Sequence, residues 1–435
     1  MSEIIKFEDV IDFYISGDWG NEESSDETPC AVSCVRGADI VPITNHNFTN
    51  IPTRYISARS LANHALQEGD IIIEKSGGSP TQSTGRVVYI SKELLESKTS
   101  IVCSNFCVAF RVKKEWNAKY IYYYLCNIYN TGAFFNFEGK TSGLKNLQVE
   151  AAFKAIPIKK IAIEEQTSIA NTLSTIESEL AVNRQINDNL EAMTKQLYDY
   201  WFVQFDFPNE EGKPYKSSGG KMVWNDKLKR EIPEGWEVVY LYNFADIKNG
   251  ATPSTANPLN YGGDIVWITP KDLSDQKSKF VYRGERNISQ LGYDSCSTNL
   301  LPANSVLLSS RAPIGLVSIA MTELCTNQGF KNLVPHDDKD SLYLYYYIMH
   351  HVKQIEQLGT GTTFKEVSRE DLCKFPILTP YNAPGYILWV DVMTGIAKKQ
   401  FVLTKEIETL TKQRDELLPL LMNGQVSVNY HLSDD

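Results

Sequence analysis

Apolar residues recur at helical spacing in two long stretches of the chain. In the first stretch the steps alternate between four and three residues, with a phase slip after the fourth position: Ile169, Leu173, Ile176, Leu180, Ile186, Leu190, Met193 and Leu197. No proline falls between residues 158 and 207. This helix could therefore run for about 40 residues, or about 60 Å at 1.5 Å per residue.

The second stretch keeps a heptad phase through six apolar positions: Ile396, Leu403, Ile407, Leu410, Leu417 and Leu421. Gln400 and Arg414 are polar interruptions of this seam. Periodic runs of such length are typical of coiled coils. Neither helix can bury its seam alone, so pairing of the two within the chain is the simplest arrangement. Packing against a helix of another protein is the alternative.

Short runs typical of β-strands occupy other parts of the chain. After Ile232-Pro-Glu-Gly-Trp236, the runs V-V-Y-L, I-V-W-I and V-L-L-S alternate with Gly, Pro and Asn turns. The aromatic cluster from Tyr198 to Phe207 is expected to end the first long helix at Pro208, and the Gly/Ser/Lys-rich section after it predicts a connector. The pattern therefore predicts mixed α/β domains joined to long helices.

The chain also repeats itself. Y-I-Y-Y-Y-L near residue 120 returns as Y-L-Y-Y-Y-I near 343, and C-S-N-F-C-V-A-F-R-V from 103 returns as C-T-N-Q-G-F-K-N-L-V from 325. The offset is 220 residues from Lys145 to Lys365 and 219 from Pro157 to Pro376. These constant offsets indicate a tandem duplication of about 220 residues.

Composition places the protein among ordinary globular proteins, with 435 residues and 42% hydrophobic residues, enough for two or three domains. No apolar run reaches the roughly 20 residues of a membrane span and no signal peptide is legible, which predicts a cytoplasmic location. The formal charge of −10 is concentrated in residues 1–30, where nine acids face one base. The nearly neutral remainder permits a local basic groove, although a DNA reader of this charge would need a more basic partner.

Four cysteines form two pairs with three intervening residues, Cys30 with Cys34 and Cys103 with Cys107. The usual zinc spacing has two intervening residues, and the flanking sequence is apolar, so reduced core cysteines are favoured over a zinc site. No metal constellation or catalytic triad is legible, and His350-His351 is expected on a helix face.

Two short motifs suggest enzymes but fit poorly. Gly139-Lys140-Thr141 resembles the end of a phosphate-binding loop, yet Phe134 stands where that loop needs glycine. A turn is favoured, with a DNA-backbone contact or a purely structural role as open alternatives. Asn257-Pro-Leu-Asn-Tyr261 resembles the motif that holds adenine in methyltransferases, but Leu259 replaces its second proline. A turn is the favoured interpretation here too.

In its two-copy layout and three sequence blocks the chain resembles the specificity (S) subunits of type I restriction–modification systems. The blocks are E-E-Q-T-S-I-A-N-T-L-S-T-I-E from 164, W-F-V-Q-F-D-F-P-N-E-E-G-K-P-Y-K from 201, and I-P-E-G-W-E from 232. Two departures occur: the first half lacks the I-P-x-G-W opening, and the second copy reads T-P-Y-N-A-P-G-Y-I where the first has its Glu-Glu-Gln helix entry.

The resemblance implies an α+β fold: two mixed α/β target recognition domains, tandem duplicated and separated by two long antiparallel coiled-coil helices. It implies a non-catalytic subunit that recognises a bipartite, asymmetric site on double-stranded DNA. Two modification subunits, which methylate adenine from S-adenosylmethionine, and two restriction subunits, which use ATP and Mg, would be its partners in phage defence. No cofactor or metal is expected in this chain, and no membrane partner.

The expected domains follow from these patterns. They are a first target recognition domain at 1–160, a first spacer helix at 161–207, a connector at 208–231, a second target recognition domain at 232–380, a second spacer helix at 381–426 and a tail at 427–435.

Basic residues in Gly/Ser-rich loops are the candidate DNA contacts, because arginine reads guanine while lysine more often holds phosphates. They are Lys75, Arg86, Lys140, Lys145, Lys271, Arg311, Lys331 and Lys365. The loop at 75–86 differs from its counterpart at 309–315, so the two half-sites should differ in sequence. The rival functions are a DNA-reading subunit of another multi-subunit restriction or methylation enzyme, and a coiled-coil scaffold without a DNA role.

Overall fold

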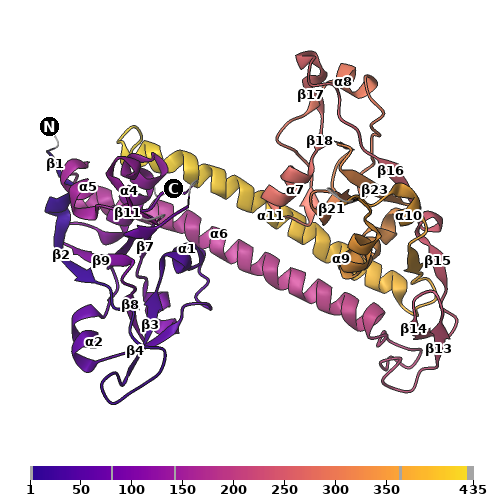
Figure 1. The fold of residues 1–435 in the computed structure, drawn as a ribbon, viewed down its shortest axis with the longest axis horizontal. Helices are drawn as coiled ribbons and strands as arrows, with labels where there is room; N and C mark the ends of the chain where they lie inside the picture. Colours follow the sequence, from indigo (N-terminus) through magenta and orange to yellow (C-terminus); the bar gives the residue numbers. More distant parts are fainter. Residues whose placement is uncertain (1–2, 80–81, 142–143, 362–364, 429–435) are drawn as a thin grey trace, which may run out of the picture. The chain divides into compact units, whose positions relative to one another are not determined.

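The computed structural model describes residues 3–79, 82–141, 144–361 and 365–428. The chain forms two compact units, which are described separately (Figure 1). Unit 1 comprises Met1–Arg184 with Ile407–Asp435, and unit 2 comprises Gln185–Glu406. Each unit therefore holds one mixed α/β domain together with one part of each long helix.

Unit 1 is built on a four-stranded antiparallel sheet in the order β2-β9-β5-β7. These strands are β2 (Ile11–Ser16), β9 (Cys107–Val112), β5 (Ile71–Glu74) and β7 (Val87–Tyr89). Three smaller sheets complete the domain, in the orders β4-β3-β8, β10-β11-β6 and β1-β12. Their strands are β4 (Thr53–Ile56), β3 (Cys30–Val35), β8 (Ser100–Cys103), β10 (Glu138–Thr141), β11 (Leu144–Leu147), β6 (Ser76–Gly77), β1 (Ile4–Lys6) and β12 (Pro157–Lys159).

The helices of this domain are short except for one tyrosine-rich helix. They are α1 (Ile40–Thr44), α2 (Ala58–His64), α3 (Lys92–Ser97), α4 (Ala118–Asn130) and α5 (Val149–Ala155). Helix α4 begins where the Asn117 side chain accepts hydrogen bonds from two backbone N–H groups of its first turn. Its tyrosines are buried against the sheet in a core shared with Ile169, Leu173 and Leu418 of the long helices.

Unit 2 is built on a five-stranded sheet in the order β16-β23-β20-β21-β19. The strands are β16 (Ala245–Asn249), β23 (Phe330–Pro335), β20 (Val306–Ser310), β21 (Ile314–Ala320) and β19 (Phe280–Val281). The remaining strands are β13 (Met222–Asn225), β14 (Arg230–Pro233), β15 (Val238–Tyr240), β17 (Tyr261–Ile265), β18 (Trp267–Ile268), β22 (Cys325–Thr326) and β24 (Pro376–Leu378). The helices are α7 (Pro270–Gln276), α8 (Gln290–Asp294), α9 (Ser341–Leu358) and α10 (Arg369–Cys373).

The duplication is visible in the structure of the two sheets. The order β2-β9-β5-β7 in unit 1 matches the order β16-β23-β20-β21 in unit 2, and in both units a tyrosine-rich helix, α4 or α9, follows the second strand of that order. His350 and His351 lie on α9, as expected. The predicted fold of two duplicated α/β domains with two long helices is confirmed.

The long helices are α6 (Ile163–Tyr198), which continues into a π-helical turn at Asp199–Val203, and α11 (Tyr386–Met422). In unit 1, Leu173 of α6 packs in the same core as Leu418 and Leu421 of α11, and in unit 2, Phe202 meets Trp389 with ring centroids 5.0 Å apart. In unit 2, Gln400 of α11 also bonds to Glu191 of α6, and in unit 1, Arg414 lies near Glu177. Within each unit the residue numbers of α11 fall as those of α6 rise, so the two segments are antiparallel. Helix α11 begins after Gly385, which has a φ of +78°.

One predicted seam position is wrong. Met193 was expected to face the other helix, but 57% of its surface is exposed, whereas its neighbour Thr194 is buried. The physical reason is that α6 packs here against α9 as well as against α11. The Tyr346 hydroxyl of α9 donates a hydrogen bond of 2.6 Å to Thr194, which turns the buried face of α6 by one residue.

A polar cluster, buried except for part of the Glu191 side chain, attaches the domain of unit 2 to both helices. The Lys279 ammonium group donates to the Tyr346 hydroxyl and to Gln400 Oε1 on α11, and it forms an ion pair with Glu191 on α6. Gln400 also donates to Glu191 at 3.1 Å. Burial lowers the pKa of Lys279, and the Glu191 charge opposes this shift. Gln400, noted above as a polar interruption, is thus hydrogen-bonded through both its oxygen and its nitrogen.

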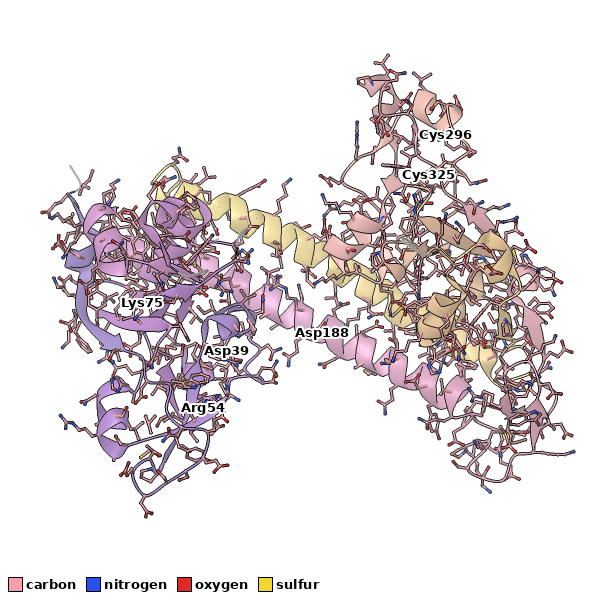
Figure 2. All side chains as sticks on the ribbon, viewed as in Figure 1. Asp39, Arg54, Lys75, Asp188, Cys296 and Cys325 are labelled. Carbon is pink, nitrogen blue, oxygen red and sulfur yellow. The ribbon has the colours of Figure 1, made fainter. Side chains whose placement is uncertain are left out.

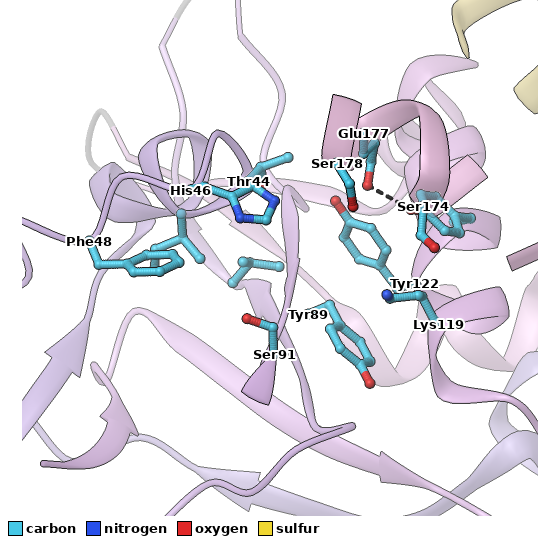
Figure 3. Close-up of a pocket in the computed structure, with 13 residues that line it drawn as sticks. Thr44, His46, Phe48, Tyr89, Ser91, Lys119, Tyr122, Ser174, Glu177 and Ser178 are labelled. Atoms are coloured by element: carbon cyan, nitrogen blue, oxygen red, sulfur yellow. Dashed lines mark hydrogen bonds between the residues drawn. The ribbon is translucent and has the colours of Figure 1, made fainter. Parts of the chain in front are cut away.

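The corresponding attachment in unit 1 is a tyrosine–glutamate pair. The Tyr123 hydroxyl of α4 donates to Glu177 Oε2 on α6 at 2.6 Å, beside a cavity of about 90 Å³ that Lys119, Tyr122 and Ser174 also line (Figure 3). Burial raises the pKa of Glu177, and the hydroxyl donor and the charge of Arg414 on α11 oppose that shift.

Glu177 should make the stability of unit 1 depend on pH. A carboxyl whose pKa is raised by folding binds its proton more tightly when folded. Its contribution is therefore complete below the ordinary glutamate pKa and lost as pH rises through the raised value. We expect Glu177→Gln, which keeps an acceptor for Tyr123, to melt at nearly the wild-type temperature at acidic pH and roughly a few degrees higher at pH 8.

Thermal melts of both proteins from pH 4 to pH 8 would measure this difference. The exposed Glu179 on the same helix supplies the control variant Glu179→Gln, for which the difference from wild type should stay constant with pH. A Glu177→Gln curve parallel to the wild-type curve would contradict the assignment.

Candidate DNA interface

Three of the candidate lysines in the first copy gather around the small sheet β10-β11-β6. In this sheet Lys145 lies opposite Lys140 on one side and opposite Gly77 on the other. Lys75 directly precedes β6, and its side chain is exposed (Figure 2). The loop prediction was wrong for Lys140 and Lys145, which lie on β-strands. Gly139-Lys140-Thr141 is part of strand β10, while residues 142 and 143 of the predicted turn lie outside the described residues.

Lys145 is held by its own domain. Its ammonium group donates to the Gln82 backbone carbonyl at 3.1 Å and lies 3.6 Å from the Glu138 carboxylate. Glu138 in turn accepts hydrogen bonds from the backbone N–H and the hydroxyl of Thr84. The lysine is thereby fixed beside the 75–86 loop and ties that loop to the β10-β11 hairpin.

Arg86 forms a buried, two-pronged ion pair with Glu74. Arg86 Nε and Nη2 donate to the two carboxylate oxygens at 2.9 and 2.6 Å, and the Glu74 side chain is only 2% exposed. These hydrogen bonds raise the pKa of Arg86. A Cβ at Gly37 or at Gly77 would lie 2.5 Å from Glu74 Oε1, so both glycines make room for this pair. The geometry gives Arg86 a structural task that the sequence did not predict.

The second copy gathers three candidates around Glu366. Lys331 lies 3.0 Å and Arg311 lies 3.7 Å from its carboxylate, and Lys365 is its exposed neighbour in sequence. The loop prediction was wrong for Lys331, which is largely buried because strand β23 lies inside the sheet, between β16 and β20. The loop prediction was also wrong for Lys271, because Thr269 caps a helix that begins at Pro270. Lys271 lies apart from this group on α7, in an exposed ion pair with Glu285.

The sequence did not single out one concave surface of unit 1. A cavity of about 550 Å³ opens beside the 75–86 loop, with Trp19, Arg36, Gly78, Asn105 and Phe106 in its wall. Phe106 is 57% exposed. The Arg36 guanidinium is held by Asp39 through hydrogen bonds of 2.9 and 2.8 Å. The sequence did not indicate that Phe106 is exposed, because it lies within the apolar Cys-x3-Cys segment. An aromatic residue between two short strands was nevertheless a signal that could have been used.

The sequence motifs that resembled a methyltransferase motif or a zinc site have structural roles. Asn257 caps the turn at Pro258–Asn260, and Asn260 is buried and donates to the Ser254 carbonyl, which confirms the turn. Burial raises the pKa of Cys34 to about 12 and that of Cys107 to about 11, as expected for reduced core thiols. Within the described residues, no cluster of three or more His, Cys, Asp or Glu side chains is suited to a metal ion. No described helix could span a membrane.

These features define a duplicated recognition protein, and comparison with known proteins places it in a family. Residues 38–192 and 233–417 match the family model of the type I restriction modification DNA specificity domain. The chain belongs to this family, whose members are the non-catalytic, sequence-specific DNA-reading subunits of type I restriction enzymes. The predicted membership is confirmed.

Individual relatives agree with the family. The MjaIX specificity subunit of Methanocaldococcus jannaschii is 39% identical over 170 residues, 38% of this chain and 39% of that relative. The HindI specificity subunit of Haemophilus influenzae is 27% identical over 312 residues, 60% of this chain and 67% of that relative. The crystal structure of an S subunit from M. genitalium matches 97% of this chain and 96% of that chain with a TM-score of 0.63 at 14% identity, which shows a shared fold.

The ion pair of Arg86 and Glu74 yields a stability prediction. We expect Arg86→Ala to lower the free energy of unfolding of unit 1 by about 3–5 kcal/mol, because it leaves a buried carboxylate unpaired. The double variant Arg86→Ala with Glu74→Ala should lose less, since no charge remains buried. Chemical denaturation of both proteins would measure this. A single variant as stable as wild type would show that Arg86 does not compensate Glu74.

Proposed function

We propose that this chain reads a bipartite, asymmetric DNA site and directs the modification and restriction subunits of a type I complex to it. The first target recognition domain, residues 1–160, would read one half-site, and the second, residues 232–380, the other. The observation that carries this proposal is that both domains share a strand order but differ in the residues at the candidate contact positions. Two similar readers with different side chains suit two different half-sites.

The candidate DNA contacts divide by their surroundings. Lys75 and Lys365 are exposed, and no carboxylate lies within ion-pair distance of either in the described structure, which suits phosphate contacts. Lys140 would contribute from strand β10. Lys145, Arg311 and Lys331 would act next to a carboxylate, and Lys271 from an exposed ion pair. Arg86 would serve mainly to shape the loop.

The family and the exposed surface support a proposal for the partners. We propose two modification subunits and two restriction subunits, in line with the two-fold repeat of the chain. In unit 2 the outer face of α11 exposes four apolar residues, Ile387, Leu388, Val392 and Val402, which suits contact with a modification subunit. S-adenosylmethionine, ATP and Mg would be bound by those partners, and the complex would work in the cytoplasm.

Exchange of one domain should change half of the recognised sequence. We expect that replacing residues 236–375 by the equivalent domain of a related specificity subunit alters one half of the methylated site and leaves the other half unchanged. Methylation-sensitive sequencing of a host that carries the chimaera with its modification subunit would measure this. A change in both halves, or in neither, would contradict the modular interpretation.

The exposed lysines should contribute affinity without sequence information. We expect Lys75→Ala and Lys365→Ala each to weaken DNA binding by the assembled methyltransferase and to reduce the slope of log K against log salt by about one. The methylated sequence should not change. Lys412→Ala on the exposed face of α11 is the matched control and should leave the salt slope unaltered. Equal slopes for all four proteins would remove Lys75 and Lys365 from the interface.

A further inference from the structure

Each unit contains a corner where one strand crosses another at very short distance. In unit 1 the Asp18 N–H donates to the Cys103 carbonyl at 2.9 Å, and in unit 2 the Ala251 N–H donates to the Thr326 carbonyl at 3.0 Å. The residue before each donor is glycine, and a Cβ on Gly17 or Gly250 would lie 2.0 Å from a backbone oxygen. Only glycine permits this approach, so both units build the same corner.

The same corner also holds the central loop of each domain. In unit 1 the N–H groups of Lys75 and Ser76 donate to the Phe106 carbonyl at 2.8 and 2.9 Å. In unit 2 the Ser310 N–H donates to the Gly329 carbonyl at 2.7 Å. By these bonds Phe106 corresponds to Gly329, and Asn105 corresponds to Gln328. Asn105 and Phe106 directly precede β9, and Gln328 and Gly329 directly precede the equivalent strand β23. The crossing strands likewise equate Trp19 with Thr252.

Exposed amide side chains occupy the same place in both corners. Asn105 and Gln328 are exposed, and each lies in a short turn between two strands: Asn105 between β8 and β9, and Gln328 between β22 and β23. Within the described residues the Asn105 amide has no protein hydrogen-bond partner, and Gln328 accepts one hydrogen bond, from the Thr252 hydroxyl, so its NH₂ group remains available. Asparagine and glutamine amides pair with adenine through one donor and one acceptor.

The surroundings of the two amides differ. In unit 1, Asn105 stands beside the exposed ring of Phe106 and the indole of Trp19, over which Arg54 stacks at 4.0 Å, in the wall of the 550 Å³ cavity. In unit 2 the equivalent positions are Gly329 and Thr252, which offer no ring. Apolar rings suit contact with a thymine methyl group or insertion beside a base step, whereas the second corner offers no ring for either.

We propose that these two corners are the base-reading sites of the protein: Asn105 with Phe106 for one half-site and Gln328 with Thr252 for the other. This assignment rests on the proposed function. Lys75 is itself held by the first corner, and Arg311 directly follows Ser310, which is held by the second. Each base reader therefore lies next to a basic residue that is a candidate DNA contact. The difference between aromatic and polar corners makes the two half-sites chemically distinct.

Substitutions at the corners test the assignment in the assembled methyltransferase. Asn105→Ala and Phe106→Ala should each reduce discrimination at one or two base pairs of a single half-site, roughly 10- to 100-fold, and Gln328→Ala should do so in the other half-site. Phe135→Ala in unit 1 and Gln290→Ala in unit 2 replace equally exposed residues away from the corners and serve as controls. Sequencing of methylated sites in a library of randomised DNA gives the readout.

The outcomes separate this assignment from the proposed function. Thermal melts first establish that the variants fold, which is expected because all three side chains are exposed. If the wild-type complex methylates a bipartite site and the three corner variants keep its full sequence preference, the corners do not read bases, while the proposed function stands. If one variant changes both half-sites, the pairing of corner with half-site is wrong. If the wild-type complex shows no bipartite site, the proposed function fails and the assignment fails with it.

Discussion

Both recognition domains depend on the same physical constraint, which is that a tyrosine hydroxyl buried against a long helix must find a partner there. The tyrosine-rich helix of each domain packs its rings into the core. One of its tyrosine hydroxyl groups donates a hydrogen bond to a residue of α6. Tyr123 meets Glu177 in unit 1, and Tyr346 meets Thr194 in unit 2. Apolar packing alone would allow the domain to slide along the helices. The hydroxyl groups accept only a few positions, so they fix how each domain sits on its helical segment.

The polar seam extends this argument to the helix pair. Gln400 and Glu191 bond to each other across the seam of unit 2, and Arg414 lies near Glu177 in unit 1. Glu177 and Glu191 are two heptads apart on α6, as are Gln400 and Arg414 on α11. Buried polar groups at seam positions specify register in coiled coils. Here the partly buried polar groups lie at the level where each recognition domain docks, so the contacts that favour one register also lie beside the docking contacts of each unit.

The sequence predicted the features that are periodic or repeated. Heptad spacing located both helices, and the repeated tyrosine blocks revealed the duplicated domains. Features that depend on contacts between distant segments were not predicted. Nothing near Arg86 in the sequence indicates that Glu74 accepts hydrogen bonds from two of its N–H groups. The pattern around Lys331 did not reveal that this residue lies on a strand. The prediction that Met193 faces the other long helix was wrong because a third helix, α9, also packs against α6 there. The glycine corners escaped notice because their two strands are more than 70 residues apart.

The charge distribution around the candidate contacts bears on how such an acidic protein could discriminate between DNA sequences. Most of the candidate cations are already paired with a carboxylate: Lys145 with Glu138, Arg86 with Glu74, Lys331 and Arg311 with Glu366, and Lys271 with Glu285. A phosphate that approaches such a pair must compete with the carboxylate, so each contact adds less affinity than an isolated lysine would. Because phosphate contacts supply most of the non-specific binding, this arrangement would keep non-specific affinity low if these residues contact DNA. Discrimination is the ratio of specific to non-specific binding. A phosphate contact that is made in both complexes contributes equally to both affinities, so this ratio would be set by the base contacts. The remaining affinity would then have to come from the partner subunits, which suits a chain whose task is to choose the sequence.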